Sequence, residues 1–270
     1  MRGEPDRYLA ATLAPAEARP ALAALAAFAA EIARIPATVS EAMLGEIRLQ
    51  WWRDALANGR EGRLSGHPVA DALVGSSVLR MVPADLLEGM IEARELDLSG
   101  GMPQDDAGLA AYLQGSEGNS FLLGLCILGA KRSEVEELAG AAGRAYGVAR
   151  GLCRMPMLLH NGGVILPAER LRSAGIDPGQ LATRPAPQDL ADAVRIVADA
   201  MVTDARADLH RARLQARRLD RRYRPALLPL AMVEPYFKAQ SSRRLLVEPA
   251  EVSPLRRVVR IGIAHVTGRL

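Results

Sequence analysis

Apolar residues recur at helical spacing along almost the whole chain. The longest such stretch carries Leu190, Val194 and Val197 on one side and continues to Leu219. Alanine, leucine, arginine and glutamate dominate, and these are the strongest helix formers, whereas runs of alternating β-branched residues are missing. The pattern predicts an all-α protein. Because no linker is long enough to separate two units, we expect residues 1–270 to form a single domain.

Proline, glycine and capping residues set the expected limits of the helices. Pro20 suits the first turn of a helix that Pro36 stops, and Ser40 is the expected N-cap of the next one, which ends near Gly59. The other predicted helices cover residues 68–81, 83–96, 106–128 with a glycine-rich break at 115–118, 133–160, 190–219, 226–238 and 255–266. A polar linker with prolines is expected at 177–187.

Composition places the chain among globular proteins. Hydrophobic residues make up 49% of its 270 positions, which is enough to fill a sizeable core. Lys131 and Lys238 are the only lysines, so the sequence pI near 9.1 reflects arginine. The formal net charge is only +3, and a nucleic-acid binder would be expected to gather a strongly basic face.

Cysteine content and the N-terminal residues indicate where the protein works. Cys126 and Cys153 cannot form a disulfide framework, and a reducing compartment suits them best. The first residues carry acids and lack the apolar run of a secretory signal. The most apolar stretch, 21–30, is shorter than the roughly 20 residues that span a bilayer. We expect a soluble cytoplasmic protein whose membrane contact is peripheral, at the inner membrane.

General catalytic and metal-binding motifs are missing from the sequence. It contains no Gly-x-Ser-x-Gly elbow, no phosphate-binding loop that ends in Gly-Lys-Ser/Thr, and no dinucleotide fingerprint after a strand. The four histidines are scattered, and none is spaced from a cysteine as a pair of metal ligands would be: His67, His160, His210 and His265. We therefore expect no zinc site.

Four carboxylates share one face of the predicted helix over residues 83–96. They are spaced three, four and three residues apart: Asp85, Glu88, Glu92 and Glu95. Like charges at this spacing destabilise a helix by a few tenths of a kcal/mol. A divalent cation or arginines would relieve the repulsion. A solvated acidic face is the commoner explanation, and Arg80 and Arg94 are close in sequence.

Arginines are densest over residues 206–224. Their guanidinium groups match phosphate oxygens in paired geometry, so a nucleic acid or another anion is one interpretation. Asp204, Asp208 and Asp220 are interspersed among them, which favours a salt-bridged exposed face. We therefore expect no nucleic-acid partner. Binding that ignores ionic strength would exclude one.

Residues 253–270 predict a basic amphipathic helix at the C-terminal end. Its apolar side carries Leu255, Val258, Val259, Gly262 and Val266, and its basic side carries Arg256, Arg257 and Arg260. Helices of this kind lie on anionic membrane surfaces. A helix docked on its own domain shows the same pattern, so the sequence leaves both interpretations open.

Several pieces of the sequence occur in the order and spacing of a known family. The most specific are RLQWWRDAL at 48–56 and GGVILP at 162–167, and the others are AALAAF at 23–28, Tyr112 with Gly118, and Gly143-x-Ala145. Over roughly residues 6–235 the chain resembles the squalene and phytoene synthases. The resemblance implies the isoprenoid-synthase fold, an all-α bundle around a central apolar cavity that holds prenyl chains.

The resemblance also implies chemistry for which this chain lacks the residues. In the family, two aspartate-rich motifs on facing helices hold Mg²⁺, which neutralises a diphosphate as an allylic cation forms. Here Ala33 and Ala37 stand in the first motif, and Arg154 and Leu158 replace the aspartates of the second. Metal ions contribute several kcal/mol to such reactions, and each ~1.4 kcal/mol is a factor of ten in rate. The ordinary head-to-head condensation is therefore not expected.

The degenerate motifs, with an intact WWRDAL stretch, resemble a phytoene-synthase-like branch that assists the assembly of respiratory complex I. The leading hypothesis is a non-catalytic, cofactor-free protein that binds a prenyl or lipid-like ligand, or a respiratory-complex subunit or another protein, at a membrane surface. The alternative is an active transferase of farnesyl or geranylgeranyl diphosphate with relocated Mg²⁺ ligands. Its candidate ligands are Glu31, Glu92, Glu95 and Asp97.

The resemblance also selects the residues expected around a ligand cavity. These are Phe28, Glu31, Arg34, Tyr112, Gly118, Asn119, Tyr146, Arg150 and Arg154. Tyr112 and Gly118 match family positions, and Asp97 corresponds to an acidic residue of many members. Trp51 and Trp52 are expected in the core.

Overall fold

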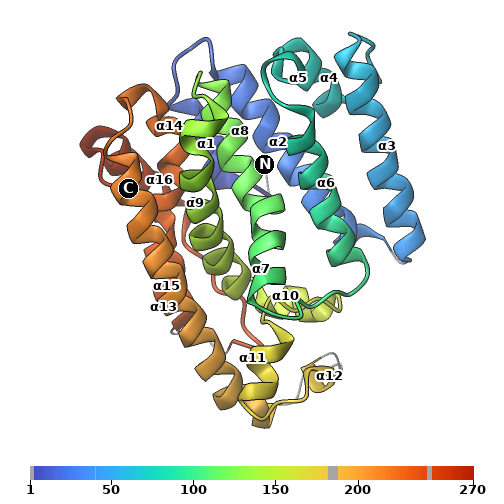
Figure 1. The fold of residues 1–270 in the computed structure, drawn as a ribbon, viewed down its shortest axis with the longest axis vertical. Helices are drawn as coiled ribbons and strands as arrows, with labels where there is room; N and C mark the ends of the chain where they lie inside the picture. Colours follow the sequence, from blue (N-terminus) through green and yellow to red (C-terminus); the bar gives the residue numbers. More distant parts are fainter. Residues whose placement is uncertain (1–2, 40, 182–187, 242–244) are drawn as a thin grey trace.

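The computed structural model describes residues 3–39, 41–181, 188–241 and 245–270, and every regular element in these ranges is helical (Figure 1). The α-helices of the first half are α1 (Pro5–Thr12), α2 (Arg19–Thr38), α3 (Ala42–Arg60), α4 (Pro68–Gly75), α5 (Val78–Met81), α6 (Ala84–Leu98), α7 (Asp106–Leu113) and α8 (Asn119–Ile127). Those of the second half are α9 (Arg132–Cys153), α10 (Met155–His160), α11 (Ala168–Ser173), α12 (Pro178–Leu181), α13 (Ala191–Ala216), α14 (Arg224–Leu227), α15 (Val233–Ser241) and α16 (Pro254–Thr267). The all-α prediction is confirmed.

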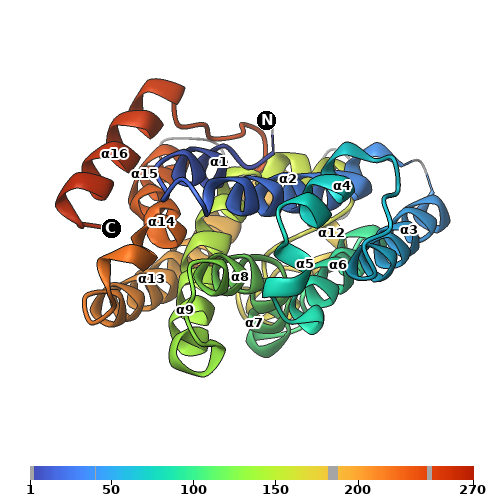
Figure 2. The same ribbon diagram turned by 90° about the horizontal axis from the view of Figure 1, so that it is seen from above.

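Short π- and 3₁₀-helical turns connect some of these helices. They are η1 (Gln114–Gly118), η2 (Gln188–Leu190), η3 (Arg221–Tyr223) and η4 (Leu228–Met232). Helix α9 lies at the centre, where it packs against α13, η1, α8 and α15. Seen from above, α13–α16 gather on one side of α9, while α3–α6 lie toward the opposite end of the molecule (Figure 2).

Small residues on α9 allow this central packing. A Cβ added at Gly143 would lie only 2.4 Å from the backbone nitrogen of Gly118, so the two segments approach backbone to backbone. Ala139, Ala142 and Ala145 of the same helix are fully buried. One hydrophobic core unites buried residues from the first helices of the chain to the last.

Helix α2 forms another wall of the core. Phe28 and Ile32 are completely buried within it. Within the described ranges, α2 is the one helix long and apolar enough to cross a membrane by length and composition. Half of its most apolar window is buried in the interior, as in the core helix of a globular bundle.

Pro36 does not end α2, contrary to the prediction. The helix continues to Thr38. A proline inside a helix removes the N–H that would bond to the carbonyl four residues earlier, and here that loss falls in the last turn, where little helix remains to be disrupted. The predicted N-cap of the next helix, residue 40, lies outside the described residues. In the structure Glu41 precedes α3.

The glycine-rich segment 115–118 is not a break. It belongs to the π-helical turn η1, which carries the chain directly from α7 into α8. A Cβ at Gly115 would lie 3.0 Å from the carbonyl oxygen of Gly89, so this glycine is needed for close contact with α6. Sequence alone does not distinguish a glycine that frees the chain from one that admits a neighbour.

Three predicted helices are interrupted. The helix over 68–81 divides into α4 and α5 at Ser77, whose φ of +62° is left-handed. The helix over 133–160 divides at Arg154, because Pro156 begins a new helical segment. The segment 226–238 contains η4 between α14 and α15, and α13 ends at Ala216 rather than near 219. The predicted linker begins with α12, and its residues 182–187 lie outside the described ranges.

Candidate functional site

A cavity lies where α2, α6, η1 and α9 converge with α10 and the 161–165 segment. It holds about 100 Å³ of free space. For comparison, an engineered cavity of about 150 Å³ holds one benzene molecule. In this conformation the cavity therefore admits a small anionic group or a few waters, and a long prenyl chain would require the walls to separate.

The four positions that the resemblance aligns with the aspartates of the two motifs line this cavity. Ala33 and Ala37 reach it from α2, and Arg154 and Leu158 reach it from the junction of α9 and α10. The two segments that the resemblance aligns with the aspartate-rich motifs therefore face one space, and at these positions they contribute two methyl groups, one guanidinium and one isobutyl group.

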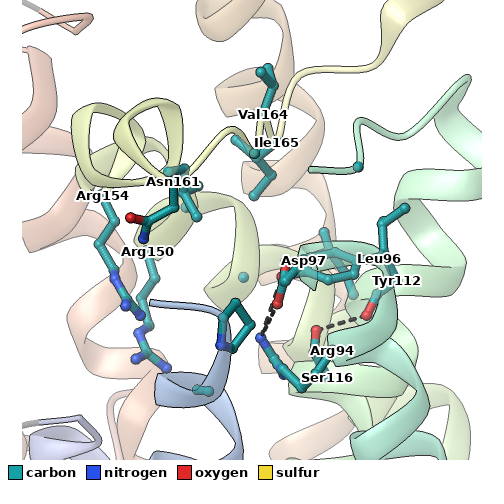
Figure 3. Close-up of a pocket in the computed structure, with 18 of the residues that line it drawn as sticks. Arg94, Leu96, Asp97, Tyr112, Ser116, Arg150, Arg154, Asn161, Val164 and Ile165 are labelled. Atoms are coloured by element: carbon teal, nitrogen blue, oxygen red, sulfur yellow. Dashed lines mark hydrogen bonds and ion pairs between the residues drawn. The ribbon is translucent and has the colours of Figure 1, made fainter. Parts of the chain in front are cut away.

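Asp97, one of two carboxylates that line the cavity, is held by an arginine and a tyrosine. Arg94 forms an ion pair with it at 2.9 Å, and the Tyr112 hydroxyl donates to it at 3.0 Å. Burial and the nearby Asp97 carboxylate raise the pKa of Tyr112, although Arg94 opposes the change, so the hydroxyl stays protonated as a donor. These contacts neutralise the charge of Asp97 (Figure 3).

Glu117 is the second carboxylate in the lining, and two buried arginines hold it. Its oxygens lie 2.7 Å from Arg7 and 3.1 Å from Arg150, and Arg150 also pairs with Glu4 at 2.7 Å. Burial alone would raise the pKa of Glu117, but Arg7, Arg150 and Arg94 lower it to about 2. Glu117 is therefore ionised and fully engaged.

Arg154 is the unpaired charge of the site. Its side chain lines the cavity and has no hydrogen-bond or ion-pair partner among the described residues. Loss of solvation and the positive charge of Arg150 lower its pKa, which is the direction expected for a cation that lacks a counter-ion. Arg150 and Arg154 lie together on one side of the cavity, across from the Arg94–Asp97 pair (Figure 3). Three arginines against two carboxylates leave the lining with an excess of positive charge.

Behind this cavity lies a second buried polar cluster, centred on the fully buried Asp6 of α1. Its carboxylate accepts hydrogen bonds from the hydroxyls of Tyr146 at 2.7 Å and Tyr236 at 2.6 Å, and from Arg257 of α16 at 2.5 Å. Burial, followed by the charge of Asp6, raises the pKa of Tyr146. The guanidinium of Arg150 stacks on the Tyr146 ring, so this cluster adjoins the arginines of the cavity.

Of the nine predicted ligand-cavity residues, Tyr112, Arg150 and Arg154 line the cavity. The other six lie elsewhere. Four of them, Phe28, Gly118, Asn119 and Tyr146, lie in the interior of the protein. Glu31 and Arg34, which pair at 2.9 Å, border a separate groove between α2 and α3 that also includes Trp51. Trp52 is buried as expected, whereas Trp51 is 39% exposed, contrary to the prediction.

Sequence reasoning missed several residues of the site. Arg94, Ser116, Glu117 and Asn161 line the cavity, and Arg7 and Glu4 stand behind it. The last two lie near the start of the sequence, where no motif marks them as part of a site. Glu117 follows two positions after Gly115 within the segment interpreted as a break. A π-turn is often found at functional sites, but no sequence signal marks it.

The relocated metal ligands proposed as an alternative do not converge. Asp97 lines the cavity, Glu92 is exposed, and Glu95 pairs with Arg53 at 2.6 Å on the outer surface. Glu31 borders the separate groove. Within the described ranges, no group of three or more histidine, cysteine or acidic side chains is placed to hold a metal ion. The residues around the cavity therefore do not fit Mg²⁺.

The acidic face is largely ion-paired, and the arginine run is ion-paired at Arg206 and Arg211. On the acidic face, Asp85 pairs with Arg132, and Arg53 bridges Glu88 and Glu95. In the arginine run, Arg211 pairs with Asp208, which also binds Arg144, and Arg206 pairs with Glu234.

The fold and the position of the cavity define an all-α isoprenoid-synthase architecture. A dehydrosqualene synthase in complex with ligand superposes with a TM-score of 0.77, covering 98% of this chain and 92% of that one at 18% identity. The squalene synthase HpnC from Alicyclobacillus acidocaldarius superposes with a TM-score of 0.73, covering 87% and 88% at 20% identity.

The chain belongs to the squalene/phytoene synthase family, because the family's sequence model, described as Squalene/phytoene synthase, matches residues 1–256. Among curated proteins it is similar to the NADH dehydrogenase (ubiquinone) complex I, assembly factor 6, of Mus musculus, with 27% identity over 233 residues. The protein of that name in Homo sapiens is 25% identical. Each match covers 86% of this chain and 69% of the relative.

Proposed function

We propose that this protein binds an anionic, lipid-like ligand in the cavity without condensing it, and that it acts in the assembly of respiratory complex I at the inner membrane, on the cytoplasmic side. The observation that carries the proposal is the charge of the cavity. Arg154 is unpaired where the family carries an aspartate, and both cavity carboxylates, Asp97 and Glu117, are already engaged by arginines.

This arrangement favours binding over ionisation of a diphosphate. Arginines hold phosphate oxygens through paired hydrogen bonds. The unpaired Arg154 offers such donors on one wall, beside the ion-paired Arg150, which adds positive charge. Metal ions supply several kcal/mol of transition-state stabilisation in this kind of chemistry. Since the lining offers no free carboxylate pair, a bound diphosphate would be held but not activated by metal.

A prenyl or lipid tail would need more room than the cavity now has. Leu158, Val164 and Ile165 provide apolar surface at the cavity, the last two from the 161–165 segment. A tail that displaced this segment would bury apolar surface, at roughly 25 cal/mol per Å². The anionic group is therefore expected to dominate recognition, while the tail adds affinity.

The role in complex I assembly rests on the relatives. Proteins named complex I assembly factor 6 in Mus musculus and Homo sapiens align over 86% of this chain. They are 25–27% identical to this chain, and this similarity supports the proposal that they share its role. A non-catalytic cavity is consistent with a protein that works by binding rather than by turnover.

Two experiments test the proposal. Farnesyl diphosphate supplied with Mg²⁺ and NADPH should give no squalene-type product, and clear turnover would refute the non-catalytic role. Calorimetric titration with farnesyl diphosphate in EDTA should show binding that Arg154→Gln weakens about 10-fold or more, because a charge-assisted hydrogen bond contributes about 1.5–3 kcal/mol. Arg34→Gln, which removes an arginine that is 60% exposed and outside the cavity, is the matched control.

The assembly role is tested in cells. Deletion of the gene should deplete assembled complex I on native gels, and the wild-type gene should restore it. Full assembly in the deletion strain would refute this part of the proposal while leaving the binding result intact.

A further inference from the structure

A second basic site lies in a groove between α13, α15 and α16, outside the cavity described above. It encloses about 510 Å³. Four cations and two carboxylates line it: Arg206, Lys238, Arg256, Arg260, Asp199 and Glu234. The groove therefore carries an excess of positive charge.

Most of this positive charge has no counter-ion. Arg206 pairs with Glu234 at 3.1 Å and stacks over the Phe237 ring. Lys238, Arg256 and Arg260, by contrast, have no ion-pair partner among the described residues.

Buried donors around the groove also lack acceptors. Gln240 is only 2% exposed, borders the groove, and its Nε2 has no hydrogen-bond partner. The Nε atoms of Arg260 and Arg213 are likewise buried and unpartnered. Burial lowers the pKa of Arg213, and although Glu234 opposes this change, the positive charges of Arg260 and Arg217 add to it. The guanidinium groups of these three arginines therefore repel one another. An anion with several acceptor oxygens would satisfy these donors.

Helix α16, which forms one wall of the groove, presents its apolar side to solvent. It is anchored to the protein by Ile261 and Ala264, which are buried, and by the ion pair of Arg257 with Asp6. Its apolar stripe points away from the core and is 48–82% exposed: Leu255, Val258, Val259, Ile263 and Val266. At 3.6 residues per turn, Arg256 and Arg260 lie on the flank between this stripe and the body of the protein.

We propose that the groove binds the phosphate group of an anionic phospholipid, while the exposed stripe of α16 lies among the lipids at the membrane surface. Interfacial helices bury an apolar face about 5–10 Å into the headgroup and acyl boundary and place cations beside it. A soluble phosphate compound would not account for the exposed stripe, and a bilayer provides acceptor oxygens and apolar surface side by side. The proposal specifies the membrane contact in the proposed function and is independent of the cavity.

The experiment is cosedimentation of the full chain with vesicles. Binding to phosphatidylcholine vesicles that contain phosphatidylglycerol should exceed binding to phosphatidylcholine alone and should fall with added salt. The double variant Arg256→Gln/Arg260→Gln should weaken binding about 25-fold, because each cation near an anionic surface contributes about fivefold. Leu255→Ser/Val266→Ser should weaken it at unchanged charge.

The control removes the same charge from a distant surface. Arg63→Gln/Arg80→Gln alters exposed arginines near α3–α5 and should leave binding within about twofold of wild type. Circular dichroism should show that every variant is folded. Equal losses in this control and the groove variant would overturn the proposal in favour of a diffuse charge effect.

Two further outcomes would overturn the proposal. Calorimetric binding of inorganic phosphate without vesicle binding would assign the groove to a soluble anion. Absence of both would assign the α16 stripe to a protein partner. Neither outcome would affect the cavity titration with farnesyl diphosphate, so the two proposals fail separately.

Discussion

Replacing Asp6 by asparagine tests how strongly the two ends of the described chain are joined. The substitution keeps the size of a fully buried side chain that accepts hydrogen bonds from Tyr146, Tyr236 and Arg257. It removes the negative charge that faces Arg257, whose side chain is 16% exposed. The guanidinium then remains partly buried without its counter-ion, and the amide –NH₂ offers donors where acceptors are needed.

The expected loss of stability follows from these contacts. Breaking a buried ion pair by removing one partner costs about 3–5 kcal/mol. Because Arg257 retains some contact with water, we expect about 3 kcal/mol. For a domain of this size each kcal/mol changes Tm by about 2–4 °C, so Tm should fall by about 6–12 °C.

Thermal unfolding followed by circular dichroism measures this change. Asp54→Asn is the matched control, because Asp54 accepts its bond from Gln50 on the exposed face of α3 and should lose less than about 0.5 kcal/mol. The double variant Asp6→Asn/Arg257→Met should be less destabilised than the sum of the single variants, since the two residues interact directly. A Tm of Asp6→Asn within about 2 °C of wild type would refute the assigned role of the cluster.

Three other outcomes are expected. Because the pKa of Glu117 falls from 4.5 to about 2 on folding, its carboxylate should contribute about 3 kcal/mol of stability above pH 4.5, and this contribution should be lost as pH falls toward 2. In urea unfolding, Glu117→Gln should be less stable than wild type at pH 7 and should lose less stability on acidification. Parallel plots of stability against pH for the two proteins would contradict this. In urea unfolding, Trp52→Ala should lower the free energy of unfolding by about 3–5 kcal/mol, because Trp52 is 4% exposed and packs on Phe28. The more exposed Trp51→Ala should lower it by less than about 1 kcal/mol. Equal losses of stability in the two variants would contradict this packing. Burial raises the pKa of Cys153 to about 12, so at pH 8 mass spectrometry should find its thiol unmodified by iodoacetamide until urea is added; prompt labelling of the native protein would contradict its burial.

Local sequence signals predicted the helices well where packing agrees with propensity. The periodic stretch after Leu190 became α13, and the C-terminal amphipathic segment became α16. The prediction was wrong where a neighbour decides the outcome. Gly115 and Gly118 serve contacts with α6 and α9, and Pro36 is tolerated in a final turn. The glycine contacts depend on residues far away in sequence, whereas Pro36 is tolerated because α2 ends two residues later.

The site was predictable only in part for the same reason. The family resemblance drew attention to Arg150 and Arg154, which line the cavity. Arg94 and Glu117 carry no local signal of their roles. Glu4, which precedes α1, and Arg7 within α1 join the site from more than 100 positions before Arg150. The amphipathic pattern of α16 also could not show which side faces solvent. The side that faces the protein carries the buried Ile261 and Ala264 and the contact of Arg257 with Asp6.

The bond between Asp6 and Arg257 also constrains how the polypeptide matures on the ribosome. The two residues are 251 positions apart, so at about 5–20 residues per second the partner of Asp6 is translated roughly 12–50 s later. Throughout that interval Asp6 of α1 lacks the guanidinium of Arg257, so the native contacts of its carboxylate are incomplete. The domain therefore cannot complete this contact during synthesis before α16 leaves the exit tunnel of the ribosome.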